Sequence, residues 1–539
     1  MHLLRLLALL FLGLAAWGAP RPKLVVVLSV DQLSADLIGR WGGDLGGGLG
    51  TLLREGVHFA AAYHEHGYTE TGPGHSVLLS GRHPAHTGIP ENRWLDRATG
   101  KFVYCVEDPL VRNLDGTPPP GSSPRWFIGS ALPGWLLDQV PGSRAFCVSG
   151  KDRSAILMAG PRVSGVFWLS NEGFTSSTAY VQALPPWLEA SNKALLEGLR
   201  THRLVWTPLR PREELPKGGR YQLPGRTVVM GLPRLIKTKN GELDPSFWER
   251  FRVSPFFDEA ILDAANRLLE GERLGRGPGT DLLMVGLSAT DYIGHHYGNA
   301  GPEMRDQLLR LDARLGAWLR TLRRNHPEAW VVLTSDHGCS DFCERLKERG
   351  LPAQRVPFPA FMERVESELS ARLQARGPFL RGTRTGSFWL KEEGTKSGRP
   401  DRGEILTAAL EVLRAQPELA GAWSAAELAA LRPDPGVAPG ARSLAERLRL
   451  SFVPGRSGDI VAALKPLLTF DDPPYLVNHG NPHDPDRRVP MVFVGPWKAG
   501  AREEPVRTVD LAPTLAKELG LAIPEPLDGQ ALELNPAPK

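Results

Sequence analysis

The sequence has no long hydrophobic run after its first twenty residues, and it has little net charge. No later stretch is long and apolar enough to span a bilayer, so we expect a mature protein that is soluble and does not use a membrane. The formal charge is only +4 over 539 residues, with basic residues scattered among acidic ones. That balance argues against a specific nucleic-acid partner.

Cysteine is also scarce, with only Cys105, Cys147, Cys339 and Cys343 in the whole chain. Four cysteines in an exported protein allow three disulfide pairings. We expect Cys339 to pair with Cys343 and Cys105 with Cys147. A cysteine zinc site is the rival interpretation, but the sequence has no CxxC pair to support it.

The N-terminus has the layout of a signal peptide. Arg5 precedes an apolar run from Leu6 to Trp17, which is short for a membrane span, and small residues follow. We predict cleavage after Gly18 and a periplasmic or extracellular location; an uncleaved membrane anchor is the alternative. The mature chain, 19–539, is too long for one ordinary core, so we expect one large domain with an insertion, or two domains.

Four apolar runs rich in β-branched residues are typical of buried parallel strands. They are KLVVVLSV (23–30), DLLMVGLSAT (281–290), AWVVLTS (329–335) and VPMVFVG (489–495). Apolar residues at helical spacing lie between them, after Ser254-Pro255 and again over 308–322. Strands that alternate with helices predict an α/β fold with a doubly wound, mostly parallel central sheet and helices on both faces.

Three of these strands lead into an aspartate, namely Asp31, Asp291 or Asp336. Open α/β sheets bind ligands outside the carboxyl ends of their strands. Each aspartate alone is more simply a helix cap or turn residue. Three in one chain, two of them close to histidines, favour a binding site at this edge.

The histidines add the nitrogen ligands that a metal site needs. His295 follows Asp291 by four residues, on one face if a helix starts there, and His337 directly follows Asp336. His479 lies downstream, before the last strand. Carboxylate oxygen with imidazole nitrogen suits zinc, whereas closely packed aspartates without a cation would repel one another. An isolated histidine here, or His296 beside it, would more simply be a hydrogen-bonded core or loop residue.

A nucleophile is predicted at Thr71, in the segment YTETGPGHSVLLSG. Pro73 suits the first turn of a helix, so Thr71 would lie at a helix N-terminus, where free N–H groups favour an anion. Metal coordination would activate the threonine hydroxyl. Taken alone, the same segment is an ordinary helix start.

Basic residues for gripping a phosphoryl group follow in SGKDRSAIL. Lys151 and Arg153 would point to one side of an extended segment, where Arg grips two phosphoryl oxygens and Lys adds charge. A solvated basic turn is the alternative. Asn92 could donate one further hydrogen bond.

Together these pieces resemble the alkaline phosphatase superfamily, and most closely its single-chain alkaline phosphatases with a threonine nucleophile. This branch lies beside the nucleotide pyrophosphatase/phosphodiesterases. The matching pieces are VDQ, TGPGH, Asn92, KDR, TDYIGHHYG, SDHG and NHGNP, and they run in the family's order along the mature chain. The ending TVDLAPTLAKELGL followed by LDG is also similar.

The resemblance implies two Zn²⁺ ions, although manganese or iron would also suit these ligands. One zinc would be held by Asp291, His295 and His479, on the side of the leaving group. The other would be held by the ligands next to the nucleophile: Asp31, Asp336, His337 and the hydroxyl of Thr71. Thr71 would attack phosphorus, and water would hydrolyse the resulting phosphothreonine.

The catalytic set implied by the resemblance is Thr71, Asn92, Lys151 and Arg153. The phosphodiesterase branch lacks the Lys-x-Arg feature, so its presence points to small phosphate monoesters as substrates. The resemblance also suggests a monomer. Cys339 and Cys343 depart from the pattern, and a Pro-, Arg- and Ala-rich region at about 340–455 is expected to form a cap insertion.

Other functions remain open. The chief alternative is a phosphodiesterase or nucleotide pyrophosphatase on the same two-metal scaffold. A sulfatase would need a C/S-x-P-x-R motif, which we do not find, and phosphoglycerate mutases of this scaffold use a serine in the cytoplasm. A secreted metal- or phosphate-binding protein without catalysis is a remote possibility from another class.

Overall fold

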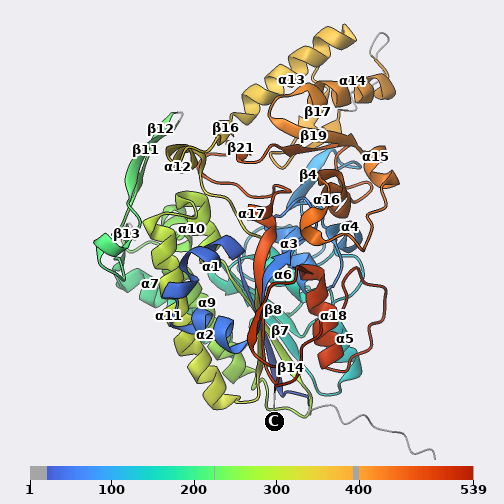
Figure 1. The fold of residues 1–539 in the computed structure, drawn as a ribbon. Helices are drawn as coiled ribbons and strands as arrows, with labels where there is room; N and C mark the ends of the chain where they lie inside the picture. The colour runs from blue at the N-terminus through green and yellow to red at the C-terminus, as the bar shows by residue number, and fades with distance from the viewer. Residues whose placement is uncertain (1–20, 224, 239, 392–399, 538–539) are drawn as a thin grey trace, which may run out of the picture.

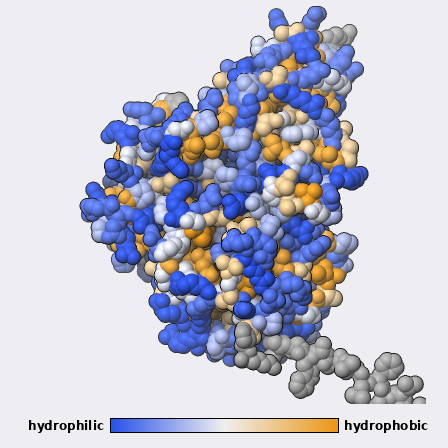
Figure 2. Space-filling model, viewed as in Figure 1, coloured by the Kyte–Doolittle hydropathy of each residue, from blue (hydrophilic) through white to orange (hydrophobic). Residues whose placement is uncertain are grey.

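The computed structural model describes residues 21–223, 225–238, 240–391 and 400–537 (Figure 1). The proposed signal peptide at 1–18 lies outside the described residues. Within the described part of the chain, no helix has both the length and the apolar character needed to cross a membrane. The face drawn in Figure 2 is largely hydrophilic with scattered hydrophobic side chains, which is ordinary for a surface in contact with water.

A ten-stranded sheet forms the centre of the molecule. Its order is β23-β2-β22-β15-β1-β14-β7-β8-β9, with β24 also paired to β2. The strands are β1 Leu24–Val30, β2 Val57–Tyr63, β7 Ala145–Ser149, β8 Gly165–Ser170, β9 Gly173–Thr175, β14 Asp281–Leu287, β15 Trp330–Thr334, β22 Arg488–Val494, β23 Gly500–Arg502 and β24 Val506–Arg507.

Most of the strands run in one direction. The block β15-β1-β14-β7-β8 is parallel throughout. The expectation of a parallel strand near the C-terminus was wrong, because β22 is antiparallel to both β15 and β2. A burial pattern reports that a strand is covered on both faces, and it carries no information about direction.

Alternate residues of β1 enter two different cores. Leu24, Val26 and Leu28 face one core, whereas Val25 and Val27 face the other. Helices α2 Gly48–Glu55, α9 Pro255–Gly271 and α11 Pro302–Asn325 cover the first face, and α5 Leu132–Gln139, α6 Asp152–Ala159 and α18 Leu511–Glu518 cover the second (Figure 1). This arrangement confirms the predicted α/β sheet with helices on both faces.

The helix starts agree with the sequence signals. Ser254 is the N-cap of α9 and Pro255 its first residue. The leucines and tryptophan expected on one face of α11 are all buried, and they are Leu308, Leu311, Leu315, Trp318, Leu319 and Leu322. Helix α11 likewise begins at a proline, Pro302. A proline at the first helical position costs no hydrogen bond, which explains why both helices can begin with one.

A second sheet lies beyond the central one, at the top of Figure 1. Its order is β17-β18-β20-β19, with α13 Phe358–Leu373 and α14 Arg402–Ala415 packed against it around a separate apolar core. The strands are β17 Leu380–Gly382, β18 Ser387–Leu390, β19 Leu419–Ser424 and β20 Ile460–Leu464. We call this unit the cap.

The expected disulfides are not formed. All four cysteines are free and buried. Cys105 and Cys147 belong to the same apolar core, and burial raises the pKa of each thiol well above its usual range. Buried, protonated thiols behave as small apolar side chains, which accounts for their place in the core without any bond between them.

Candidate active site

The site lies where the strands of the central sheet end. Asp31 directly follows β1, and Asp336 lies two residues beyond β15. Asp291 lies in the first turn of α10, Ala289–Tyr297, which begins just after β14. Since β15, β1 and β14 are parallel neighbours, their carboxyl ends bring the three buried aspartates to one edge.

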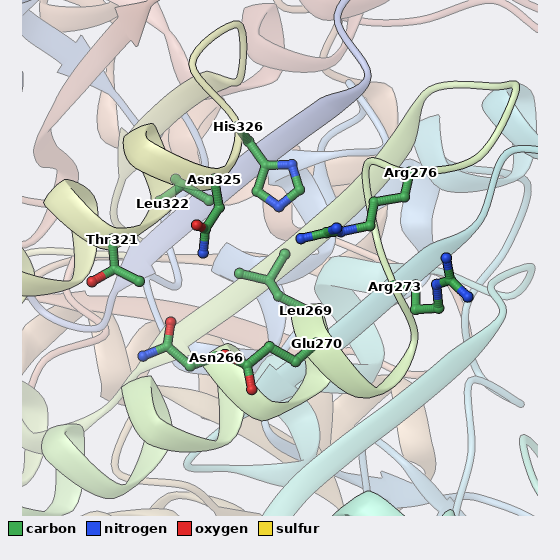
Figure 3. Close-up of a pocket in the computed structure, with 9 residues that line it drawn as sticks. All are labelled: Asn266, Leu269, Glu270, Arg273, Arg276, Thr321, Leu322, Asn325 and His326. Atoms are coloured by element: carbon green, nitrogen blue, oxygen red, sulfur yellow. The ribbon is translucent and has the colours of Figure 1, made fainter.

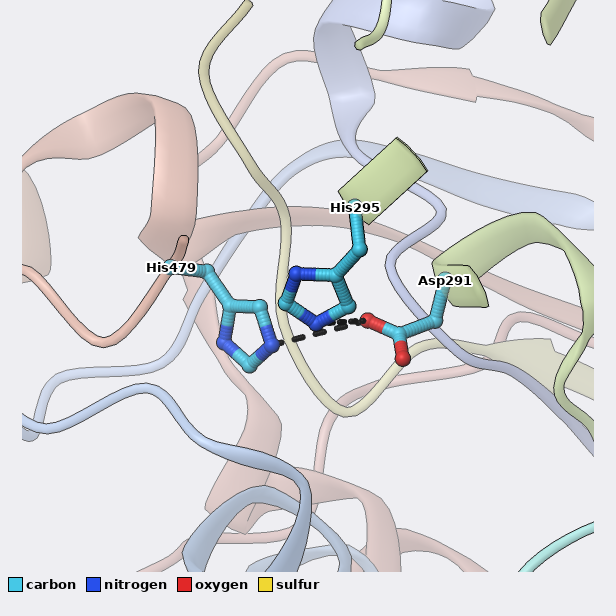
Figure 4. Close-up of side chains that lie close together, drawn as sticks. All are labelled: Asp291, His295 and His479. Carbon is cyan, nitrogen blue, oxygen red and sulfur yellow. Dashed lines mark ion pairs between the residues drawn. The ribbon is translucent and has the colours of Figure 1, made fainter. Parts of the chain in front are cut away.

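One candidate metal-binding group consists of Asp291, His295 and His479 (Figure 4). Both histidine Nε2 atoms face the same carboxylate oxygen, at 3.4 Å for His295 and 3.5 Å for His479. Asp291 and His295 are four residues apart on α10, as their spacing predicts, and His479 comes from a loop before β22. Sequence segments almost 190 residues apart therefore supply one ligand set.

A second group lies beside the first and consists of Asp31, His75 and Asp336. His337 adjoins both groups, because its Nε2 lies 3.3 Å from Asp336 Oδ2 and 4.0 Å from Asp291 Oδ1. Its ring stacks on His479 with centroids 3.6 Å apart. The imidazole of His337 therefore lies between the two groups.

Three of these histidines have their outer nitrogen fixed by the backbone. Nδ1 lies 2.6 Å from Val477 O in His295, 3.0 Å from Gly338 O in His337 and 2.7 Å from Thr69 O in His479. A carbonyl can only accept, so Nδ1 carries the proton and Nε2 keeps its lone pair. This arrangement fixes the tautomer that a metal ligand requires.

Several atoms at the centre have no hydrogen-bond partner. Among the described buried atoms, Asp31 Oδ1, Asp336 Oδ2 and His337 Nε2 are in this state. Buried polar atoms are normally paired, so three at one point indicate a site built for a ligand that accepts their lone pairs. Oxygen and nitrogen donors in this number suit a divalent cation such as zinc.

Charge balance at the site depends on Lys151. Its Nζ lies 2.9 Å from Asp31 Oδ2 and 2.5 Å from Asp291 Oδ2. Burial would raise the pKa of Asp291, but Lys151 and His295 hold it well below its usual range. Burial raises the pKa of Asp31 despite the same lysine. One ammonium therefore does not compensate both carboxylates.

Thr71 is the first residue of α3, Thr71–Leu78, and is 1% exposed. A Cβ on Gly74 would lie only 2.0 Å from the carbonyl oxygen of Asp336, so a glycine is needed for the helix to approach this loop. The close approach places the start of α3 against the second group. Free N–H groups at a helix N-terminus also favour an anion there.

Lys151 and Arg153 do not lie in an extended segment, and that part of the prediction was wrong. Lys151 is the N-cap of α6, and Arg153 is in its first turn. Both still face the site, because Arg153 Nη2 lies 3.4 Å from Thr71 Oγ1. Tyr104 steadies the guanidinium by accepting a bond from Nη1 at 3.2 Å.

Asn92 is held on both sides. Its backbone N–H donates to Glu70 Oε2 at 2.7 Å, and its Oδ1 accepts from Gly72 N at 2.7 Å. The amide therefore has its oxygen occupied and its Nδ2 protons available as donors. This orientation suits an incoming phosphoryl oxygen next to Thr71.

His75 is the residue that the sequence reasoning missed. It lies one turn after Thr71 on α3, and its Nδ1 is 2.9 Å from Thr71 O and 3.2 Å from Asp336 Oδ2. Its Nε2 is 3.1 Å from Ser29 Oγ and 3.4 Å from Asp31 Oδ1. The signal was the i, i+4 spacing from Thr71 within TGPGH.

A separate pocket lies at the opposite, amino end of the strands (Figure 3). Its cavity is about 290 Å³ and is lined by the ends of α9 and α11 and the loops that follow them. The lining residues are Asn266, Leu269, Glu270, Arg273, Arg276, Thr321, Leu322, Asn325 and His326. The predicted nucleophile, the residues predicted to bind the phosphoryl group and the predicted metal ligands are not among them.

Comparison with known proteins gives a consistent picture. The model of the family "Type I phosphodiesterase / nucleotide pyrophosphatase" matches residues 25–472. The chain is 34% identical to alkaline phosphatase PhoK of Sphingomonas sp., over 96% of this chain and 92% of the relative. It is also 34% identical to alkaline phosphatase PhoD of Zymomonas mobilis, over 96% of this chain and 89% of the relative.

Solved structures agree on the fold. The crystal structure of alkaline phosphatase PafA superposes with a TM-score of 0.83 at 25% identity, covering 95% of this chain and 98% of that one. Murine ectonucleotide pyrophosphatase/phosphodiesterase 5 matches with a TM-score of 0.52 at 15% identity, covering 95% and 97%. The chain therefore belongs to the type I phosphodiesterase/nucleotide pyrophosphatase family, within the alkaline phosphatase superfamily.

Proposed function

We propose that the protein is a metal-dependent phosphatase that hydrolyses phosphate monoesters through Thr71. The observation that supports this most is convergence: Thr71, Arg153 and two groups of metal-ligand type meet at the carboxyl edge of the sheet. Homologues named alkaline phosphatase cover almost the whole chain, which agrees with the same activity.

Two zinc ions would complete the site. Asp291, His295 and His479 would hold one. The other would be held by the set that surrounds the nucleophile: Asp31, Asp336, His337 and Thr71 Oγ1. We prefer His337 to His75 as the nitrogen ligand, because His337 Nε2 has no hydrogen-bond partner whereas both His75 nitrogens are hydrogen-bonded, to Ser29 Oγ and Thr71 O. Manganese or iron would also suit the same oxygen and nitrogen donors.

In the proposed reaction, Thr71 Oγ1 attacks phosphorus and the alcohol departs, leaving a phosphothreonine that water then hydrolyses. Zinc bound at both sites would supply the positive charge that acidifies the attacking hydroxyl and stabilises the departing oxygen. Arg153 and the amide of Asn92 hold phosphoryl oxygens in line for attack. Lys151 adds the remaining positive charge, and phosphoryl transfer demands little beyond such positioning and charge.

The monoester is favoured over the diester because of charge. A monoester presents a dianionic phosphoryl group, which matches Lys151 together with Arg153. A diester carries one charge and a second substituent. Phosphodiesterase or nucleotide pyrophosphatase activity is the second candidate, since the matching family model bears that name.

We also propose export and a monomeric state. The N-terminal run ending at Gly18 has the composition of a signal peptide, which would deliver the protein to the periplasm or the medium. A monomer is what the family resemblance implies.

The test compares 4-nitrophenyl phosphate with methyl 4-nitrophenyl phosphate, which share one leaving group. We expect kcat/KM at alkaline pH to favour the monoester by several orders of magnitude and to collapse on chelation. Thr71→Ala should abolish turnover with zinc still bound, while Thr71→Ser should retain part of it. A preference for the diester would assign the protein to the phosphodiesterase branch instead.

A further inference from the structure

A pocket of about 590 Å³ opens directly beside the candidate active site. Lys151 and Arg153, the proposed grip on the phosphoryl group, form part of its wall. The wall also contains residues of α10, β8 and the loop before His479.

The pocket adjoins the ligand group proposed for the leaving-group side. The Tyr475 ring lies 4.8 Å from the ring of His295, centroid to centroid, and 5.5 Å from His296. Tyr292 directly follows Asp291, and Lys151 Nζ lies 4.9 Å from its ring centre. An alcohol that departs past Asp291 and His295 would therefore enter this pocket.

The walls of the pocket combine aromatic surface with negative charge. Trp168, Tyr292 and Tyr475 supply the aromatic side chains. Beyond the phosphoryl grip, the charged residues are four carboxylates, Asp115, Asp152, Glu172 and Glu249, against the single guanidinium of Arg252.

The Arg252 guanidinium keeps its charge but is partly engaged by neutral neighbours. The Arg252 guanidinium donates to Asn171 and lies 5.9 Å from the Trp248 ring centre, so part of its bonding capacity is already used. With four carboxylates against one guanidinium, the outer pocket carries an excess of negative charge.

We propose that this pocket binds the alcohol part of the phosphate ester and selects alcohols that are uncharged or cationic over those with a second anionic group. The inference rests on the proposed phosphomonoesterase function. A quaternary ammonium would gain from both the aromatic faces and the carboxylates. A carboxylate or second phosphate on the alcohol would meet the same acidic wall and be repelled.

The expected size follows from Coulomb's law at a wet surface. One carboxylate about 6 Å from a substrate charge changes kcat/KM by roughly 3-fold at low salt, and screening removes much of this at high salt. Two carboxylates acting together should change it by about 10-fold. The change in kcat/KM must have opposite signs for esters of cationic and of anionic alcohols.

The experiment compares phosphocholine, its uncharged isostere 3,3-dimethylbutyl phosphate, and phosphoglycolate on the zinc-loaded enzyme at low ionic strength. The test variant is Glu172→Gln/Glu249→Gln, since both side chains are exposed and neither belongs to the proposed catalytic set. Glu197→Gln, an exposed carboxylate on α7 Pro186–Thr201 outside the pocket, is the matched control.

In the double variant we expect kcat/KM to fall about 10-fold for phosphocholine and rise about 10-fold for phosphoglycolate, relative to the uncharged ester. The control should leave both of these ratios unchanged, and salt should shrink the differences between substrates in the wild type. If each of the two ratios is the same in the wild type and the double variant while the uncharged ester is hydrolysed, the pocket proposal is overturned. If no monoester is hydrolysed, the proposed function fails instead.

Discussion

The two ends of the central sheet carry polar pockets of different kinds. At the amino end, the pocket of Figure 3 contains Arg273, Arg276 and His326, in loops before β14 and β15. At the carboxyl end, Asp31 and Asp336 follow two strands of the same parallel block. Both ends offer charge and space, so neither property alone marks a functional site.

What separates them is the state of their polar atoms. At the carboxyl end, Asp31 Oδ1, Asp336 Oδ2 and His337 Nε2 are buried without a hydrogen-bond partner. Among the described residues that line the amino-end pocket, no buried atom is in that state. Such atoms also occur elsewhere among the described residues, but here three of them meet between two groups of metal-ligand type. Since an unpaired buried polar atom costs free energy, this cluster is better evidence of function than cavity size.

Removing a ligand at the carboxyl end should have the largest effect. Asp291→Asn replaces the carboxylate that faces His295, His479 and Lys151. We expect metal affinity and kcat/KM to fall by at least about 100-fold, as even supporting residues of metal sites cost 10–100-fold. Metal content after dialysis and steady-state kinetics measure both effects.

The control for this variant is Asp263→Asn, an exposed carboxylate paired with Arg314 on the helical face. It should retain the metal and full activity. Full metal content in Asp291→Asn would contradict the assignment of the first ligand group.

Removing the guanidinium of Arg153, which is proposed to hold the phosphoryl group, should have the next largest effect. Arg153→Ala deletes the group that lies 3.4 Å from Thr71 Oγ1. Loss of one oriented donor in a transition state costs about 10²–10³ in rate, so we expect a loss of that order for the monoester and a much smaller one for the methyl diester.

Arg162→Ala is the matched control, because that side chain is exposed and pairs only with Asp138 among the described residues. Equal losses on monoester and diester in Arg153→Ala would break the argument for monoester selectivity while leaving the metal site intact.

The sequence anticipated the carboxyl end better than the rest of the molecule, for a physical reason. Strand runs that end in Asp31 or Asp336 place their side chains by chain direction alone, since parallel neighbours end at one edge. His295 follows from Asp291 by helical spacing. In the structure, Asp291 and His295 lie in one group with His479, and Asp31 and Asp336 lie in the other.

Features that depend on packing between distant segments were not predictable in this way. The direction of β22 and the free state of Cys105 and Cys147 depend on tertiary neighbours that no local pattern reports. His75 was missed because its partners, Asp31 and Asp336, lie far away in the sequence. The cap boundary at about 455 stays a prediction, although β20 of the cap sheet lies beyond it.

A smaller effect is expected where the cap meets the loop of Asn92. Glu91 is buried and accepts hydrogen bonds from the hydroxyls of Thr383, Thr385 and Ser387. Burial, with repulsion from Glu70, raises the pKa of Glu91 to about 8. A carboxyl whose pKa is higher in the folded than in the unfolded state stabilises the fold most below its unfolded pKa of 4.5. This stabilisation is lost as the pH rises through the folded pKa of about 8.

Glu91→Gln should therefore flatten the fall of Tm between pH 5 and 9, because the amide keeps the hydroxyl bonds without a proton to lose. Thermal unfolding across this range, with metal held saturating, measures the effect. Glu363→Gln, at an exposed carboxylate on α13 of the cap, is the control and should leave the wild-type slope. An unchanged slope in Glu91→Gln would mean that this carboxyl is already ionised in the native state.

The smallest effect is expected at the amino end, and it decides whether the contrast between the two pockets is real. Arg276 is exposed and lines the Figure 3 pocket. Arg276→Ala should change stability by no more than about 0.5 kcal/mol and kcat/KM by less than about 2-fold, since exposed substitutions away from special contacts are close to neutral. A 10-fold loss of activity would show that this end of the sheet is coupled to the chemistry, and unpaired buried atoms would then no longer suffice to separate a working pocket from an ordinary hollow.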